Sequence, residues 1–246
     1  MRKEPFFVGD IVHIYNRGNR KQEIVRNDKD RWNFLQILYY FNNEHSPANP
    51  MQSLQRVLKS DFNTKLVWPS VWGEHNPLVE ILAFVLMDNH YHLVLKEIVE
   101  GGVTRFMRKF GTGMTNRFNT RYKETGRLFQ GAYRARRVDK DNYLQYLMVY
   151  IHIKNVFELY PGGFENALRN FDDAFEFALQ HQYSSLGAHF SDAHISHPIV
   201  SVDDEVVAQT LGNKEDFKEF AKNCINFVHF DEGMAGAEAP SSFAGA

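Results

Sequence analysis

Two adjacent strand-like segments near the middle of the chain constrain its fold most. Residues 78–87 form an almost continuous apolar run, which is typical of a strand buried on both faces. Residues 88–89, Asp-Asn, are a turn signal, and residues 90–97 follow as a second strand that we expect to return antiparallel beside the first. Because successive side chains on a strand point to opposite faces, His90 and His92 should project together from one face of this sheet.

Two imidazoles on one strand face can offer ring nitrogens to a single divalent cation. The pattern alone is a weak signal, because the chain has 11 histidines and two strand histidines can equally be satisfied by polar neighbours. The interpretation therefore depends on the surrounding sequence.

Residues 101–138 concentrate positive charge in a chain whose formal net charge is −2. Glu124 is the only acidic residue of this segment. Its basic residues are Arg105, Arg108, Lys109, Arg117, Arg121, Lys123, Arg127, Arg134, Arg136 and Arg137. The interleaved aromatics are Phe106, Phe110, Phe118, Tyr122, Phe129 and Tyr133, the first four at helical spacings that favour a core role. A run of one charge is costly by self-repulsion unless it meets an anionic partner, so the segment favours nucleic-acid binding.

Composition narrows the class of protein further. Hydrophobic residues make up 43% of the 246, enough for a real core, and no run approaches the roughly 18 apolar residues of a membrane span. The opening residues do not resemble a secretion signal, and Cys224 is the only cysteine, so we expect a reducing, cytoplasmic environment and no cysteine-based zinc site. Acidic residues gather in 165–246, which places the expected nucleic-acid face in the first two thirds of the chain.

The remaining elements alternate in a way that predicts an α+β fold. The expected strands are 10–17, 78–87, 90–97 and 127–138, and the expected helices are 28–43 with Asp28 as its cap, a short one near 52–60, 103–122, 141–156, 165–180 and 214–227. This order predicts an antiparallel sheet packed by helices. We expect a main domain at 1–160 with an insertion at 45–76, a small C-terminal helical extension at 161–232 and a disordered tail at 233–246.

The helix after the basic strand carries Tyr143, Tyr146 and Tyr150. At α-helical spacing Tyr146, Tyr150 and Lys154 share one face, so a tyrosine could point toward the histidines with a lysine beside it. A phenol attacks phosphorus only if it is held in line and the phosphate charge is neutralised, for example by a metal. Spacing alone is more typical of core or interfacial tyrosines.

Several ordered motifs resemble the single-tyrosine HUH transposases of bacterial insertion sequences, and especially the REP-associated tyrosine transposases. They are residues 87–92 (Met-Asp-Asn-His-Tyr-His), 126–131 (Gly-Arg-Leu-Phe-Gln-Gly), 150–156 (Tyr-Ile-His-Ile-Lys-Asn-Val), the opening 13–19 with 30–31 and 34–35, and Tyr-Ser-Ser-Leu at 183–186. The similarity covers about residues 8 to 190 and is far more specific than two histidines alone.

The resemblance implies a ferredoxin-like (RRM-like) sheet and a divalent metal, Mg²⁺ or Mn²⁺, held by His90 and His92. By matching position, Tyr150 is the nucleophile of an endonuclease and strand transferase that cleaves and rejoins single-stranded, hairpin-flanked DNA. A 5′-phosphotyrosine and a free 3′-OH would form without nucleotide hydrolysis. A bacterial cytosol or nucleoid is the implied location, and a homodimer is one assembly that the family allows.

Lys154 departs from the family pattern, because relatives usually carry Asn or Gln four residues after the tyrosine. A protonated ammonium has no lone pair and cannot ligate a metal. Three alternatives follow: Asn155 or a carboxylate from elsewhere completes the site, Lys154 acts in catalysis by contacting the phosphate, or cleavage has been lost. A local realignment by one position is a further interpretation.

The cations expected to bind DNA are Arg17, Arg20, Arg105, Arg108, Lys109, Arg127, Arg134, Arg136 and Arg137. The main alternative to a transposase is a domesticated, non-cleaving DNA-binding protein that keeps the fold and the basic surface. An RNA-binding module with a similar sheet would explain the charges and the aromatics, but it would give the two histidines no role.

Overall fold

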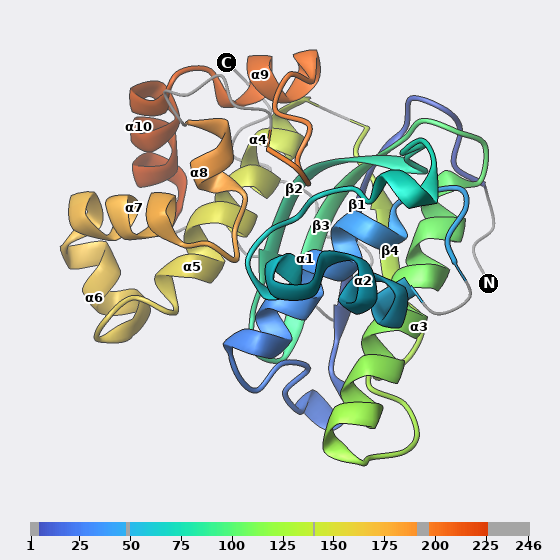
Figure 1. The fold of residues 1–246 in the computed structure, drawn as a ribbon. Helices are drawn as coiled ribbons and strands as arrows, with labels where there is room; N and C mark the ends of the chain where they lie inside the picture. Colours follow the sequence, from blue (N-terminus) through green and yellow to red (C-terminus); the bar gives the residue numbers. More distant parts are fainter. Residues whose placement is uncertain (1–4, 48–49, 140, 191–196, 226–246) are drawn as a thin grey trace.

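A four-stranded antiparallel sheet lies at the centre of the protein. The computed structural model describes residues 5–47, 50–139, 141–190 and 197–225. The strands are β1 (Ile11–Arg17), β2 (Val79–Leu86), β3 (His90–Glu97) and β4 (Arg134–Arg137), in the spatial order β2-β3-β1-β4. All neighbours are antiparallel; the helices at residues 28–41 and 50–58 lie between β1 and β2, and the helix at residues 102–122 lies between β3 and β4 (Figure 1). This is the ferredoxin-like order, so the predicted α+β fold class is confirmed.

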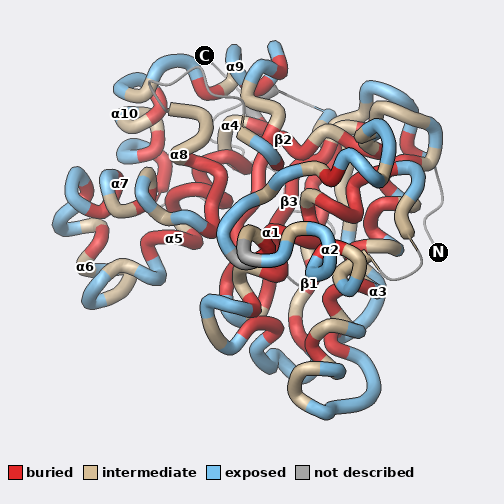
Figure 2. Tube along the Cα trace, in the orientation of Figure 1, coloured by how far each residue is buried: buried red, intermediate tan, exposed pale blue. Residues whose placement is uncertain are grey.

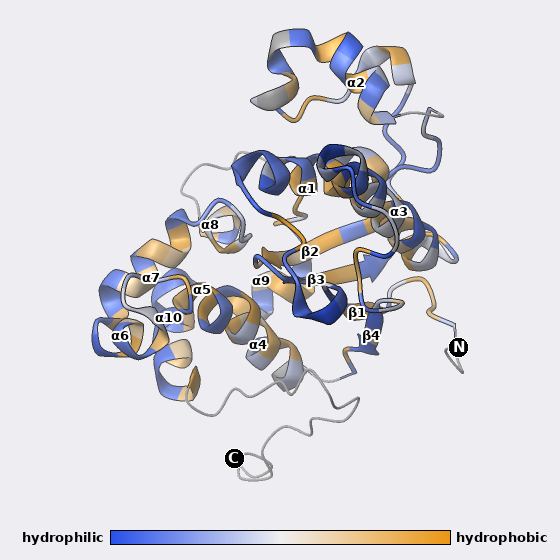
Figure 3. Cartoon of the chain, turned by 90° about the horizontal axis from the view of Figure 1, so that it is seen from below, coloured by the Kyte–Doolittle hydropathy of each residue, from blue (hydrophilic) through white to orange (hydrophobic). Residues whose placement is uncertain are grey.

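Two long helices cover one face of the sheet. They are α1 (Asp28–Phe41) and α3 (Gly102–Tyr122), and Figure 3 shows both on the same side of the strands. The side chain of Asn27, rather than the predicted Asp28, caps α1 by accepting a hydrogen bond from the Asp30 amide, at 3.2 Å. Gly113 allows the close approach of the two helices, since a Cβ there would lie 3.2 Å from the Phe41 ring.

The opposite face carries a broken helix and the C-terminal helices. The broken helix consists of α4 (Asp141–Val149), a π-helical turn η4 (Tyr150–Lys154) and α5 (Asn155–Phe157). Beyond it lie α6 (Gly163–Arg169), α7 (Phe171–Gln180), α8 (Leu186–His189), α9 (Glu205–Leu211) and α10 (Lys214–Cys224). A second apolar cluster joins these helices to Ala83, Val85 and Val94 of the sheet, so the C-terminal helices share a core with the strands.

The segment predicted as an insertion lies on the outer side of α1 (Figure 3). It contains α2 (Pro50–Leu58) and short 3-10 turns at Lys59–Asn63 and Ser70–Trp72, while a further 3-10 turn, Asn19–Lys21, follows β1. Trp68 stacks on His75 with ring centroids 4.2 Å apart, and the Val67 amide donates to the Tyr40 hydroxyl at 3.1 Å. The insertion thereby buries the outer surface of α1.

The C-terminal segment covers the outer edge of β2. Ser184 forms an antiparallel bridge with Val85, and Val200 forms a parallel bridge with Ile81. The Leu86 amide donates to the Tyr183 carbonyl at 2.9 Å, and the Ser185 amide donates to the Phe84 carbonyl at 3.0 Å. The burial colouring of Figure 2 shows the result, since β2 and β3 are buried along nearly their whole length.

Several predicted boundaries need correction. The strand expected at 127–138 is interrupted: the regular ladder covers β4, the Asn16 side chain donates to the Gly131 carbonyl at 3.1 Å, and Phe129 forms an isolated bridge with Gly18. The helix expected at 165–180 divides at Asn170, whose φ of −119° and ψ of 48° are not helical. Helix α9, which was not predicted, begins at the cap Asp204. The expected tail, 233–246, lies outside the described residues.

Candidate active site

Strand register gathers polar side chains on the face of the sheet that α4 covers. Tyr15 of β1 lies opposite His92 of β3 on one side and Arg134 of β4 on the other. Arg17 pairs with His90 in the same way. His90 and His92 therefore share a face with a row of basic and aromatic side chains, as the alternation predicted.

His92 lies at the centre of this row and is 2% exposed. Its Nδ1 is 3.0 Å from Nε2 of His13, and its ring stacks on those of His13 and Tyr15. Its Nε2 is buried and has no hydrogen-bond partner within the described part of the chain. Burial, followed by the neighbouring charges, lowers the pKa of His92 well below its ordinary value, so the ring is neutral and one of its nitrogens carries a lone pair.

Tyr150 packs directly against the histidine pair. Its ring meets the His92 ring edge-on, with centroids 5.1 Å apart and an interplanar angle of 90°. The other two tyrosines of this helix have other ring contacts: Tyr143 packs against the Arg136 guanidinium at 4.2 Å, and Tyr146 packs on Phe220 at 5.5 Å. Among the three tyrosines considered in the sequence, only Tyr150 has a ring contact with His92.

The π-helical turn decides which residue of the helix reaches His90. The α-helical spacing of Tyr146, Tyr150 and Lys154 ends at this turn, because a π turn needs one residue more than an α turn. Asn155 thus occupies the place toward the histidines: its Oδ1 is 3.1 Å from Nε2 of His90, and its Nδ2 donates to the Tyr150 carbonyl at 2.8 Å. π-bulges of this kind are frequent at functional sites.

Lys154, one residue earlier, has different contacts. Its Nζ forms an ion pair with Oε1 of Glu158 at 3.2 Å and lies 5.7 Å from the centroid of the Tyr150 ring. It also contributes a positive charge that acts on His92. The lysine is therefore beside the tyrosine ring, whereas the amide of Asn155 is at the histidine.

The donor set suits a divalent metal. His90 and His92 each present an Nε2, and Asn155 adds an amide oxygen, ligand types that Mg²⁺ and Mn²⁺ accept. Nδ1 of His90 is 2.6 Å from Oδ1 of Asn89, a contact that leaves Nε2 for another partner. The described residues contain no cluster of three His, Cys, Asp or Glu side chains able to hold a metal, and the amide of Asn155 is the group that lies against His90.

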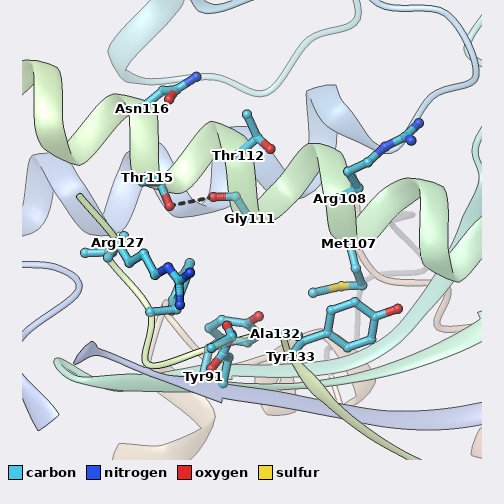
Figure 4. Close-up of a pocket in the computed structure, with 14 residues that line it drawn as sticks. Tyr91, Met107, Arg108, Gly111, Thr112, Thr115, Asn116, Arg127, Ala132 and Tyr133 are labelled. Atoms are coloured by element: carbon cyan, nitrogen blue, oxygen red, sulfur yellow. Dashed lines mark hydrogen bonds between the residues drawn. The ribbon is translucent and has the colours of Figure 1, made fainter. Parts of the chain in front are cut away.

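Two of the predicted DNA-binding cations, Arg108 and Arg127, line a cavity of about 640 Å³ between α3 and the segment before β4 (Figure 4). Tyr91, Thr112 and Tyr133 are among its walls, and none of the described residues that line it is acidic. Because Tyr91 alternates with the two histidines, the cavity opens on the face of the sheet opposite Tyr150.

The other predicted cations divide into two groups. Arg17, Arg134 and Arg136 lie along the histidine face, and Arg20 is exposed just after β1. Three others have structural contacts: Arg105 pairs with Glu44 at 3.4 Å, Lys109 donates to the Glu44 carbonyl at 3.0 Å, and Arg137 pairs with Asp10 at 2.9 Å.

Sequence reasoning missed His13 and Tyr15 as parts of this site. Both belong to a strand that was predicted, and the period of two within residues 11–17 puts them on one face. Which neighbour faces that side depends on the register of β1 against β3, which a single sequence does not reveal.

The fold and the site together define a ferredoxin-like protein with a strand histidine pair facing a helix tyrosine. Residues 73–154 match the family model described as "Transposase IS200 like", so the predicted resemblance to this transposase family is confirmed over this segment. The matched segment contains His90, His92 and Tyr150.

Two solved structures are similar to the chain. One is of a REP-associated tyrosine transposase bound to a REP hairpin, with 13% identity and a TM-score of 0.41 over 77% of this chain and 83% of that one. The other is of a Deinococcus radiodurans R1 protein described as a transposase, with 14% identity and a TM-score of 0.26 over 61% of this chain and 95% of that one. A comparison with curated proteins finds no match. No helix among the described residues is long and apolar enough to cross a bilayer.

Proposed function

We propose that the protein cleaves and rejoins single-stranded DNA, with Tyr150 as the nucleophile. The observation that carries this proposal is that one helix presents both the Tyr150 ring to His92 and the Asn155 amide to His90. A purely structural tyrosine would need neither a buried histidine pair nor an amide oxygen beside it. The family match over residues 73–154 supports the same class of reaction.

The chemistry is an exchange of esters. The Tyr150 oxygen attacks a backbone phosphorus, the bond from phosphorus to the 3′ oxygen breaks, and the phenol proton leaves while the 3′ oxygen gains one. The products are a 5′-phosphotyrosine and a free 3′-OH. Attack of a 3′-OH on that phosphotyrosine reverses the step and rejoins DNA, so no nucleotide hydrolysis is needed.

His90, His92 and Asn155 would hold a divalent metal, Mg²⁺ or Mn²⁺, which when bound would neutralise the charge of the scissile phosphate. Lys154 adds a positive charge beside the Tyr150 ring, where it can help to stabilise a phosphate. Burial keeps His92 neutral and so preserves its lone pair for this role.

The DNA would follow the positive row formed by Arg17, Arg134 and Arg136, which lies on the face of the sheet that carries Tyr150. The cavity lined by Arg108 and Arg127 offers a second basic surface on the other face, suited to a folded part of the strand such as a hairpin. Cations on both faces fit a substrate that combines a single strand with a hairpin.

A non-cleaving DNA-binding protein is the second candidate function, and one observation favours it. Tyr150 is 4% exposed and His92 is 2% exposed, so a phosphate reaches the tyrosine only when neighbouring side chains move. Such a protein would keep the basic surface and lose the chemistry.

Incubation with single-stranded hairpin DNA and Mg²⁺ or Mn²⁺, followed by a denaturing gel, separates the two candidates. We expect a covalent adduct with the unmodified protein and none with Tyr150→Phe, which loses only the attacking oxygen. Tyr146→Phe is the matched control, because Tyr146 packs on Phe220 and should leave the adduct intact. An adduct that persists in Tyr150→Phe disproves our choice of nucleophile, and salt-sensitive DNA binding without any adduct supports the second candidate.

A further inference from the structure

His13 has a contact that the proposed chemistry does not use. It lies on β1, is 3% exposed, and its Nε2 is 3.0 Å from Nδ1 of His92. Two ring nitrogens at this distance share one hydrogen, so one nitrogen donates and the other accepts, and this hydrogen bond has a direction.

The two directions leave His92 in different states. If His13 donates, the hydrogen of His92 is on Nε2, which is buried and has no acceptor among the residues that the structure describes. If His92 donates from Nδ1, its Nε2 carries a lone pair instead. Buried N–H groups without an acceptor are rare in folded proteins, so the second direction is favoured.

The surrounding charges favour the same direction. Arg17 and Lys154 both act electrostatically on His92. An electron-rich nitrogen is stabilised by two nearby cations, whereas an N–H group would add further positive charge beside them. The His13 ring is also fixed in orientation, because it stacks on Tyr15 with centroids 5.1 Å apart and on His92 at 5.2 Å.

His90 shows a parallel arrangement. Its Nδ1 is 2.6 Å from Oδ1 of Asn89, and its Nε2 is the nitrogen that faces Asn155. In metal sites, the partner of the second ring nitrogen fixes the tautomer and the orientation of the ligand histidine. Both histidines of the pair are held at Nδ1 in this way.

We infer that His13 is a positioning residue: its Nε2 accepts the Nδ1–H of His92 and so holds the Nε2 lone pair of His92 ready for a divalent metal. The inference rests on the metal site of the proposed function, but it concerns the protein before DNA binds. His13 itself touches neither the metal nor the DNA in this role.

The first test is nitrogen NMR of the histidine rings in the metal-free protein, with His92 assigned through a His92→Gln variant. We expect the His92 hydrogen on Nδ1, with Nε2 unprotonated. A His92 hydrogen on Nε2 overturns the inference.

The second test measures Mn²⁺ binding by calorimetry in His13→Leu and His13→Gln. The leucine has no acceptor, and we expect it to weaken Mn²⁺ binding about 10- to 100-fold and to leave His92 in a mixture of tautomers. The glutamine can accept through its amide oxygen and should stay within a few-fold of the unmodified protein. Unchanged affinity in His13→Leu, or equal losses in both variants, overturns the inference.

Both tests are made without DNA, so they do not depend on cleavage. If His13→Leu does not fold, the NMR of the unmodified protein still decides the direction of the hydrogen bond. If the expected tautomer and Mn²⁺ binding are found while no covalent adduct forms with DNA, the role of His13 stands and the proposed function fails.

Discussion

The two faces of the sheet use the same strands for different purposes. On the face toward α1 and α3, the side chains of β1 and β3 include Val12, Ile14, Leu93 and Leu95, all fully buried in one apolar cluster. On the face toward α4, the alternate residues are histidine, tyrosine and arginine at one end of the strands, with Ile11, Val94 and Lys96 at the other.

This difference shows how a small fold can carry a polar site without losing stability. Alternation along each strand gives one face mainly to packing, so the polar residues of the other face need not contribute much burial. Substitutions on the face toward α1 and α3 should therefore mainly lower stability, and substitutions on the face toward α4 should mainly affect the chemistry.

The largest expected effect comes from replacing, in separate variants, two adjacent residues of β3 that lie on opposite faces. His92→Ala should reduce adduct formation by about 100-fold or more, since the proposed metal site loses one of its three ligands, and should lower the free energy of unfolding less than a truncation on the other face does. Leu93→Ala should lower that free energy by about 2 to 5 kcal/mol and leave the rate per folded molecule unchanged. Urea unfolding and single-turnover cleavage measure the two quantities. Equal stability losses in both variants would contradict the division between the faces.

Acid should destabilise the protein by protonating His189 of α8, whose Nε2 donates to the Leu82 carbonyl at 2.9 Å. Burial lowers the pKa of His189 from 6.5 to about 4. Between these values the unfolded state binds more protons, so stability is complete above pH 6.5 and decreases as the pH falls toward 4, by at most about 3 kcal/mol. Urea unfolding at pH 7 and pH 5 should show a shallower decrease in His189→Gln. Identical decreases in the two proteins would remove His189 as a cause.

Asn155→Ala and Lys154→Ala compare the two residues at the π turn. Because Asn155 contacts His90, its replacement by alanine should weaken Mn²⁺ binding about 10- to 100-fold. Lys154 pairs with Glu158 instead, so its replacement should affect cleavage more than metal affinity. Calorimetry with Mn²⁺ measures the first effect and adduct formation the second. If Lys154→Ala alone lost metal binding, the assignment of Asn155 would be wrong.

The smallest effect should distinguish two arginines of β4 that lie on opposite faces. Arg134→Gln should reduce the salt dependence of single-stranded DNA binding by about 0.7 in the logarithmic slope, as expected for one phosphate contact. Arg137→Gln should leave the slope unchanged, because Arg137 is paired with Asp10. Fluorescence anisotropy over a range of salt concentrations measures both. A changed slope in Arg137→Gln alone would move the DNA to the other face.

The strands and the histidine pair were predictable because their signals are local. The run 78–87, the Asp-Asn turn and the alternation after it lead directly to the β2-β3 hairpin, and His90 to Glu97 form the strand that was expected. Tyr150 followed from family motifs rather than from spacing, and the structure places its ring beside His92.

What the sequence did not reveal depends on geometry that no local pattern encodes. Helical spacing pairs Tyr150 with Lys154, but the π turn replaces the lysine with Asn155, one of the alternatives that the sequence left open. His13 joins the site through strand register. The strand expected at 127–138 is interrupted before β4, where the Asn16 side chain donates to the Gly131 carbonyl, and Phe129 forms an isolated bridge with Gly18.

The hydrogen bonds between the C-terminal segment and the edge of β2 have a consequence for synthesis of the chain. The bond between Phe84 and Ser185 spans 101 positions, so β2 leaves the ribosome long before the segment that protects it. At about 5 to 20 residues per second, this delay is roughly 5 to 20 s. An unpaired strand edge invites pairing with other chains during that interval. Translation that stops near residue 180 would leave the edge exposed permanently, so incomplete chains should be the first to aggregate and to reach the chaperones and proteases of the cell.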